Sequence, residues 1–154
     1  MRQVKEDAHA RFHARSRSYV YRIVFRKNPF VDELAWRGYY NPDVVEMNKA
    51  AEYLLEFDDF ECFSKIRTEV KHFRCQIKSA YWEQKDGELL FHITANRFLR
   101  GMVRAIVGTL IEIGYHHRPA AEMKQIIIDK KRVNAGKSAP AMGLFLSRIE
   151  YPIE

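Results

Sequence analysis

The segment Asn96–Leu110, NRFLRGMVRAIVGTL, is the centre around which this chain of 154 residues is organised. Read at 3.6 residues per turn, the aliphatic side chains of this segment and the next turn form one broad apolar stripe: Leu99, Met102, Val103, Ile106, Leu110 and Ile113. Gly101, Ala105 and Gly108 form a small-residue seam that suits close packing against another backbone. The pattern therefore predicts a packed helix that follows a strand and ends near Gly114.

Three arginines, Arg97, Arg100 and Arg104, would lie along one flank of this helix, because spacings of three, four and seven residues return to the same side. Arg104 is unusual because both of its neighbours, Val103 and Ala105, are expected to be packed. No carboxylate lies three or four residues away, and a guanidinium near a core needs a partner. That partner would come from another segment, another domain or a ligand phosphate. The alternative is a surface arginine that reaches solvent from an ordinary core helix.

Composition indicates one domain over residues 1–154, because the chain is long enough for a real core and rich in apolar side chains. Cys62 and Cys75 form no CxxC pattern, which favours a reduced, cytoplasmic chain over a disulfide scaffold or a zinc site. The longest apolar run is interrupted by charges, and the start lacks a signal-peptide core. We therefore expect no membrane association, no metal and no cofactor.

The basic excess is confined to one end of the chain. Residues 1–28 contain eight Lys and Arg against two acidic residues, a balance of +6 that equals the formal net charge of the whole chain. A focused positive field suits a polyanion such as nucleic acid. The alternative, a solvated basic tail, is weakened by the aromatic residues among the charges, such as Phe12, Tyr19 and Tyr21.

The remaining pattern predicts an α+β domain, in which helices pack on one face of a mainly antiparallel sheet. Alternation predicts strands over residues 17–26, 34–40, 70–84, 89–95 and 144–151, with a possible bulge in the third and a hairpin turn around Gly87. Helix signals cover residues 41–55, with Asn41 as the cap, and 119–131, with Pro119 at the start and Ala121 facing inward.

Two short motifs resemble known ligand sites but lack the residues that such sites need. Gly136-Lys137-Ser138 resembles the C-terminal part of a phosphate-binding loop. However, Lys131 occupies the position of the leading glycine, and no strand precedes this segment. The adjacent His116 and His117 point apart, and cations after a helix C-terminus are common because of the helix dipole. Taken alone, these features favour an RNA-binding α+β domain and say little about chemistry.

Five segments occur in the order seen in the tRNA pseudouridine synthase A family, and the resemblance covers essentially the whole chain. They are residues 9–12 (HARF), 17–21 (RSYVY), 59–63 (DFECF), 96–104 (NRFLRGMVR) and 139–146 (APAMGLFL). The resemblance implies the C-terminal half of the pseudouridine synthase fold. It also implies a cytoplasmic, homodimeric isomerase that needs no cofactor and converts uridine to pseudouridine in the anticodon stem-loop of tRNA.

The resemblance also implies roles for individual residues. Tyr19 resembles the aromatic platform under the uracil and a member of the catalytic machinery, Arg104 the arginine that pairs with a nucleophilic aspartate, and Leu144 an apolar wall of the pocket. The expected RNA contacts are His9, Arg11, Arg15, Arg17, Asn96 and Phe98.

One departure from the family pattern concerns the nucleophile itself. The family's aspartate lies in a Gly-Arg-Thr-Asp-Ala-Gly-Val-His motif, upstream of the segments matched here, and this sequence does not contain it. Arg67-Thr68-Glu69 lacks the flanking glycines and is not a displaced copy. Two hypotheses follow: a domain of an active enzyme that is inert alone, or a naturally truncated homologue that binds RNA without chemistry. Intact Tyr19, Arg104 and Leu144 favour the first.

Overall fold

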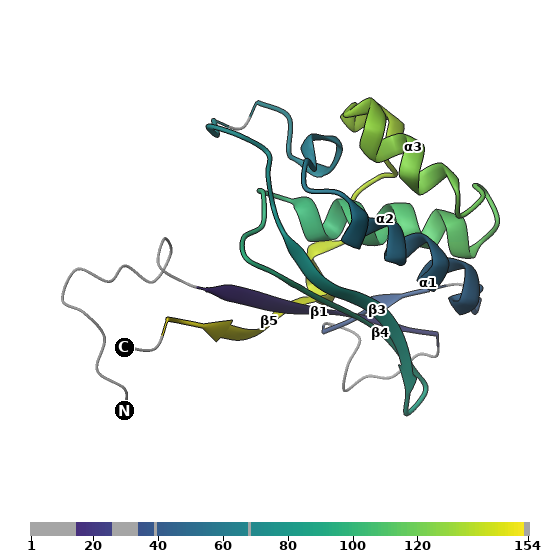
Figure 1. The fold of residues 1–154 in the computed structure, drawn as a ribbon. Coiled ribbons are helices and arrows are strands. Elements are labelled where there is room, and N and C mark those ends of the chain that lie inside the picture. Colours follow the sequence, from purple (N-terminus) through teal and green to yellow (C-terminus); the bar gives the residue numbers. More distant parts are fainter. Residues whose placement is uncertain (1–14, 26–33, 39, 68, 153–154) are drawn as a thin grey trace.

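A computed structural model describes residues 15–25, 34–38, 40–67 and 69–152 of the chain. Figure 1 shows a twisted sheet with the three α-helices gathered on one of its faces. The strands are β1 (Ser16–Val24), β2 (Trp36–Arg37), β3 (Ile77–Lys85), β4 (Glu88–Ala95) and β5 (Leu144–Glu150), and the helices are α1 (Val44–Glu52), α2 (Met102–Gly114) and α3 (Glu122–Asp129). The predicted α+β class, with helices on one face of a mainly antiparallel sheet, is confirmed.

Strand β1 is the centre of the sheet. It pairs antiparallel with β4 on one side, and with β5 (antiparallel) and β2 (parallel) on the other. Tyr21 and Ile23 are fully buried and face the helices, as the alternation in β1 predicts. β3 completes the sheet beyond β4 through a tight hairpin, in which Asp86 and Gly87 both have positive φ angles (52° and 77°). The expected bulge in β3 lies between Ile77 and Ser79.

Helix α2 begins later than the sequence predicts. Residues 96–101 form a loop, and the chain enters α2 through Gly101, whose φ of 75° is left-handed. Arg97 and Arg100 therefore precede the helix, and the predicted flank of three arginines is wrong. Every residue of α2 except Arg104 and Glu112 is buried, so the helix is covered on nearly all sides.

The loop that precedes β5 lies directly on α2. The backbone N–H of Ala139 donates to the Arg104 carbonyl (2.9 Å), and that of Gly136 donates to Thr109 Oγ1 (2.8 Å). At Gly108 a Cβ would lie 1.8 Å from the carbonyl oxygen of Lys137. The small-residue seam is thus confirmed at Gly108 and wrong at Gly101, which lies outside the helix.

The other helices also begin later than expected. Asp43 rather than Asn41 caps α1, because its carboxylate accepts a bond from the Glu46 backbone N–H (3.1 Å). The predicted inward face of α3 is confirmed at Met123, Ile126 and Ile127, which are buried. It is wrong at Ala121, which is exposed just before α3, whereas the preceding Ala120 is buried. Among the described residues, no helix combines the length and the apolar character needed to span a membrane.

Candidate pocket and nucleic-acid interface

Tyr19 is half-buried in the middle of β1, on the face of the sheet that carries the helices. The ring of Phe98 meets it edge-on, with centroids 5.1 Å apart and planes at 85°. This geometry is favourable for an aromatic pair and fixes the orientation of the Tyr19 ring. Within the described part of the chain, the Tyr19 hydroxyl has no hydrogen-bond partner, so it is free to meet a ligand.

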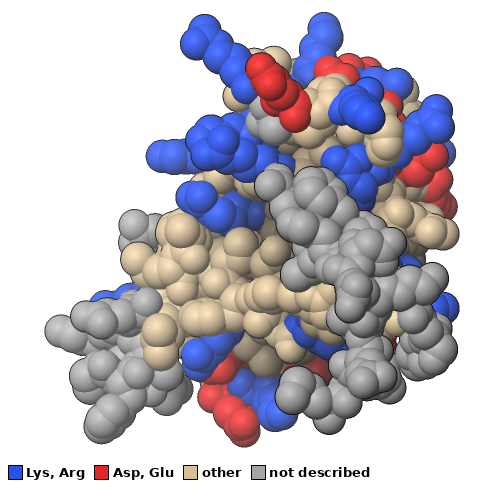
Figure 2. All heavy atoms as spheres, turned by 90° about the vertical axis from the view of Figure 1, so that its left-hand side faces the viewer, with Lys and Arg blue, Asp and Glu red and all other residues tan. Residues whose placement is uncertain are grey.

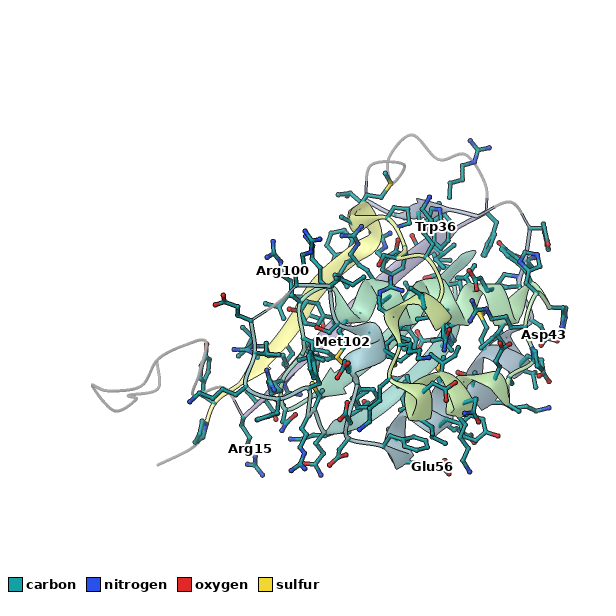
Figure 3. All side chains as sticks on the ribbon, turned by 90° about the horizontal axis from the view of Figure 1, so that it is seen from above. Arg15, Trp36, Asp43, Glu56, Arg100 and Met102 are labelled. Atoms are coloured by element: carbon teal, nitrogen blue, oxygen red, sulfur yellow. The ribbon has the colours of Figure 1, made fainter. Side chains whose placement is uncertain are left out.

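A hollow of about 820 Å³ opens beside Tyr19 and Phe98. Four arginines line it, Arg17, Arg67, Arg97 and Arg100, together with one carboxylate, that of Glu69. Figure 2 shows Lys and Arg side chains gathered next to a stretch of uncharged surface on this end of the molecule, and Figure 3 shows Arg15 and Arg100 at that end, far from Asp43. A hollow with aromatic walls and a cationic rim suits a nucleotide, whose base stacks and whose phosphate is anionic.

The arginines of the hollow differ in what they contact. Arg97 Nη1 donates to the carbonyl oxygens of Arg74 (3.0 Å) and His72 (3.3 Å), so this side chain holds the segment before β3 in place. Arg100 is exposed, and its carbonyl accepts the Lys65 N–H (2.9 Å). Arg100 therefore both presents a charge and fixes the neighbouring loop.

Arg104 lies in the first turn of α2, half-buried. Its Nε donates to the carbonyl oxygen of Ala139 (2.7 Å), so the predicted partner from another segment exists, and it is a carbonyl. Within the described residues no carboxylate forms an ion pair with Arg104. The two Nη groups thus remain available for an acid from outside these residues.

Tyr21 connects the pocket residues, and sequence reasoning had assigned it no role. It follows Tyr19 on the same face of β1, and its cross-strand partner on β5 is Leu144, which is half-buried. Burial raises the pKa of Tyr21, and the positive charge of Arg104 lowers it. The two side chains also donate to neighbouring carbonyl groups of one loop, Arg104 to that of Ala139 and Tyr21 to that of Pro140. The sequence feature that could have identified Tyr21 is the alternation of the strand, which places Tyr21 two residues after Tyr19 and on the same face.

The loop before β5 closes over Tyr21. Its hydroxyl donates to the Pro140 carbonyl oxygen (2.6 Å), and a Cβ at Gly143 would lie 2.7 Å from its ring. The structure therefore brings Tyr19, Arg104 and Leu144 to one region around Tyr21. Arg104 and Leu144 do not line the hollow beside Tyr19.

The predicted RNA-contact residues have different surroundings. Asn96 is exposed, but its Oδ1 accepts the Gln76 N–H (2.7 Å), so only its amide nitrogen stays available. Phe98 and the half-buried Arg17 line the hollow, and Arg15 is exposed at the start of β1. His9 and Arg11 lie outside the described residues.

Sequence reasoning missed Arg67 and Glu69 as pocket residues, because they join the hollow only through the tertiary fold. Among the described residues, no group of three or more His, Cys, Asp or Glu side chains could hold a metal ion. Cys62 and Cys75 are buried free thiols.

A family model described as tRNA pseudouridine synthase matches residues 50–152. The chain belongs to this family. The tRNA pseudouridine synthase A of Bacteroides thetaiotaomicron is 46% identical over 155 residues, covering 99% of this chain and 58% of the relative. That of Porphyromonas gingivalis is 46% identical over 154 residues, covering 99% of this chain and 61% of the relative. The chain thus spans about three-fifths of the length of the curated relatives it matches.

Membership of the pseudouridine synthase family is consistent with the location of the pocket. The matched residues include β3, β4, α2 and β5, and hence Arg104 and Leu144. Tyr19 precedes residue 50, but the similarity to the two relatives extends over 99% of the chain and so includes β1. The recognised family is one of isomerases that modify tRNA; the roles of individual residues stay predictions.

Proposed function

We propose that this chain supplies the arginine and aromatic part of the active site of an enzyme that converts uridine to pseudouridine in the anticodon stem-loop of tRNA. The observation that supports this most directly is Arg104, half-buried beside Tyr21 and without a carboxylate partner among the described residues. A half-buried guanidinium whose two Nη groups have no carboxylate partner is well suited to bind an acid by two parallel hydrogen bonds. In this proposal the acid is the family's nucleophilic aspartate, which this sequence does not contain.

The isomerisation needs no net gain or loss of atoms. The bond between uracil N1 and ribose C1′ breaks, and a bond between C5 and C1′ forms. C5 then loses its proton, and N1 ends with one. The protein therefore has to hold the base while it is turned, stabilise an aspartate near the sugar, and accept the proton at C5.

Each of these tasks has a candidate among the described side chains. The Arg104 Nη groups can hold a carboxylate by two parallel hydrogen bonds. The Tyr19 ring offers a stacking surface, its orientation fixed by Phe98. Its hydroxyl oxygen can take the C5 proton, directly or through water, as the hydroxyl passes its own proton on to solvent. Leu144 supplies an apolar wall.

The RNA around the target base is anionic, and the hollow beside Tyr19 has a cationic rim of Arg17, Arg67, Arg97 and Arg100. We assign to this rim the phosphates next to the target uridine, together with the exposed Arg15. Residues 1–154 act as one domain in this proposal, and the enzyme works as a cytoplasmic homodimer. Sedimentation of the complete enzyme tests the homodimer.

The activity test uses tRNA that carries tritium at C5 of its uridines, because the label is released only when C5 loses its proton. The chain alone should release none. The chain fused to the remaining part of the Bacteroides thetaiotaomicron relative should release it, and the same fusion with Arg104→Ala should not. Turnover by the chain alone would contradict the proposed origin of the nucleophile. An inactive fusion that binds tRNA would favour the alternative, a homologue that binds RNA without chemistry.

A further inference from the structure

A second hollow, of about 420 Å³, lies where α3 ends. Five cationic side chains line it, Lys65, Arg67, Lys130, Lys131 and Arg132, against one carboxylate, that of Glu61. We call it the basic groove. Neither the family resemblance nor the sequence pattern predicts this groove, because the two segments that line it, residues 61–73 and 130–133, lie far apart in the sequence.

The backbone builds the groove and fixes two of its cations. Lys130 ends α3 with a left-handed φ of 59°, and its Nζ pairs with an Asp59 carboxylate oxygen (3.3 Å). Arg132 donates to the Gly136 carbonyl (2.9 Å) and to Ser138 Oγ (3.0 Å), so it supports the loop that covers α2. These two residues have structural partners inside the protein.

Lys131 lies between them and differs from both. It is exposed, and in the part of the chain that the structure describes its ammonium takes part in no ion pair. Its side chain does not cap the following turn. Lys131 therefore adds a positive charge to the groove that no internal contact explains.

The basic groove lies next to the hollow beside Tyr19, and Arg67 lines both. The two are also joined by the bond from the Lys65 N–H to the Arg100 carbonyl (2.9 Å). A cationic track thus leads from the aromatic platform, past Arg67, to Lys131. Figure 2 shows several Lys and Arg side chains on the upper part of this face, with fewer acidic side chains among them.

The apolar residues of the groove also suit RNA. Ile66 and Val133 leave 63% and 79% of their surface exposed, and both line the groove. A nucleic-acid strand presents anionic phosphates and less polar sugars at short intervals, so it can contact both kinds of side chain. A small inorganic anion would contact the cations alone.

We propose that the basic groove binds the phosphate backbone of the tRNA arm beyond the target uridine, with Lys131 and Arg67 as its contacts. This inference rests on the proposed function, because it takes the RNA to be anchored by a base at Tyr19. The groove then contributes affinity without touching the reacting atoms.

The test measures the binding of unmodified tRNA to the full chain over a series of salt concentrations. Lys131→Ala removes one phosphate contact and should lower the slope of log K against log salt by about 0.7–0.9. Arg67→Asn removes another; asparagine suits the left-handed φ of 63° at this position. The matched control is Lys124→Ala, an exposed lysine of α3 outside both hollows, which should leave the slope unchanged.

The outcomes separate this inference from the proposed function. Arg67 belongs to both hollows, so Lys131→Ala decides the outcome. If binding weakens with Arg100→Ala and Arg67→Asn but not with Lys131→Ala, the groove is not an RNA contact, and the proposed function stands. If the wild-type chain shows no saturable binding to tRNA even at about 50 mM salt, both fail. Equal melting temperatures of all variants establish that the changes act on binding and not on folding.

Discussion

Within the described residues, the Arg104 side chain makes one hydrogen bond, from Nε to the Ala139 carbonyl oxygen. Arg104→Lys should therefore lower the free energy of unfolding of the isolated chain by about 1 kcal/mol, the usual value of one hydrogen bond. For a domain of this size, that corresponds to a fall of about 2–4 °C in melting temperature. Arg100→Lys, at an exposed position, is the control and should leave the melting temperature unchanged.

In the fused enzyme the same Arg104→Lys change should reduce turnover far more than stability. A lysine ammonium cannot hold a carboxylate by two parallel bonds, and breaking a buried pair usually costs about 3–5 kcal/mol, of which the retained charge recovers part. Single-turnover rates and melting curves of the fusion provide the comparison. Proportional losses in both would give Arg104 a structural role only.

The two parts of the Tyr19 side chain have separate proposed roles: the ring stacks on the base, and the hydroxyl takes part in proton transfer. Tyr19→Phe keeps the ring and its edge contact with Phe98, so tRNA affinity should be retained. Loss of the hydroxyl should slow the fused enzyme by at least about a hundredfold, the low end for general acid–base catalysis. Tyr19→Leu should lose both properties.

Filter binding and single-turnover rates of the Tyr19 variants separate the two contributions. A Tyr19→Phe enzyme that turns over at the wild-type rate would reduce Tyr19 to a stacking surface. The free hydroxyl in the structure is the reason to expect otherwise, since its hydrogen-bonding capacity is not used within the described chain.

At the scale of elements, the contact between α2 and the loop before β5 holds the pocket together. Gly108→Ala tests it, because alanine in a helix interior normally stabilises by about 0.5–1 kcal/mol. Here the added Cβ would lie 1.8 Å from the Lys137 carbonyl oxygen, a backbone atom that cannot rotate away. We therefore expect Gly108→Ala to destabilise the protein, lowering the free energy of unfolding measured by urea denaturation by more than about 2 kcal/mol.

Gly87→Ala is the control for this experiment. Gly87 has a left-handed φ of 77°, and a Cβ there would meet nothing within 4 Å. Gly87→Ala should therefore lower the free energy of unfolding by about 1–2 kcal/mol, from backbone strain alone. If Gly108→Ala proved the milder of the two changes, the close packing of the loop on α2 would be contradicted.

At the scale of the whole molecule, three buried acids make the fold sensitive to alkaline pH. Burial raises the pKa of Cys62 to about 12 and that of Cys75 to about 11, and it also raises the pKa of Tyr21. In the unfolded chain a thiol ionises near pH 8.5. The stability contributed by the neutral thiols is therefore complete below about pH 8.5. It is lost between about pH 8.5 and 11 for Cys75 and between about pH 8.5 and 12 for Cys62.

Urea midpoints at about pH 7 and about pH 10 measure this loss, which amounts to at most about 1.4 kcal/mol per pH unit for each thiol. The double variant Cys62→Ala/Cys75→Ala should be less stable at pH 7 but should show a shallower dependence on pH. An unchanged dependence would mean that other groups govern the alkaline transition.

The sequence alone determined the fold class and most of the elements. Alternation in residues 17–26 identified β1 and the buried face that carries Tyr21 and Ile23, because side chains on a strand must alternate between its two faces. It also located α2 and the end of that helix at Gly114. These features depend on local periodicity, which a sequence contains in full.

The tertiary structure decided where helices begin and which residues form the pocket. The start of α2 depends on the left-handed turn at Gly101, and a glycine permits such a turn without requiring it. The Ala139 carbonyl as partner of Arg104, the role of Tyr21, and the joining of Arg67 to Lys131 all bring together segments far apart in the chain. No local pattern specifies such contacts, because they arise only when the sheet and the helices have packed and a particular backbone carbonyl or side chain is brought within reach.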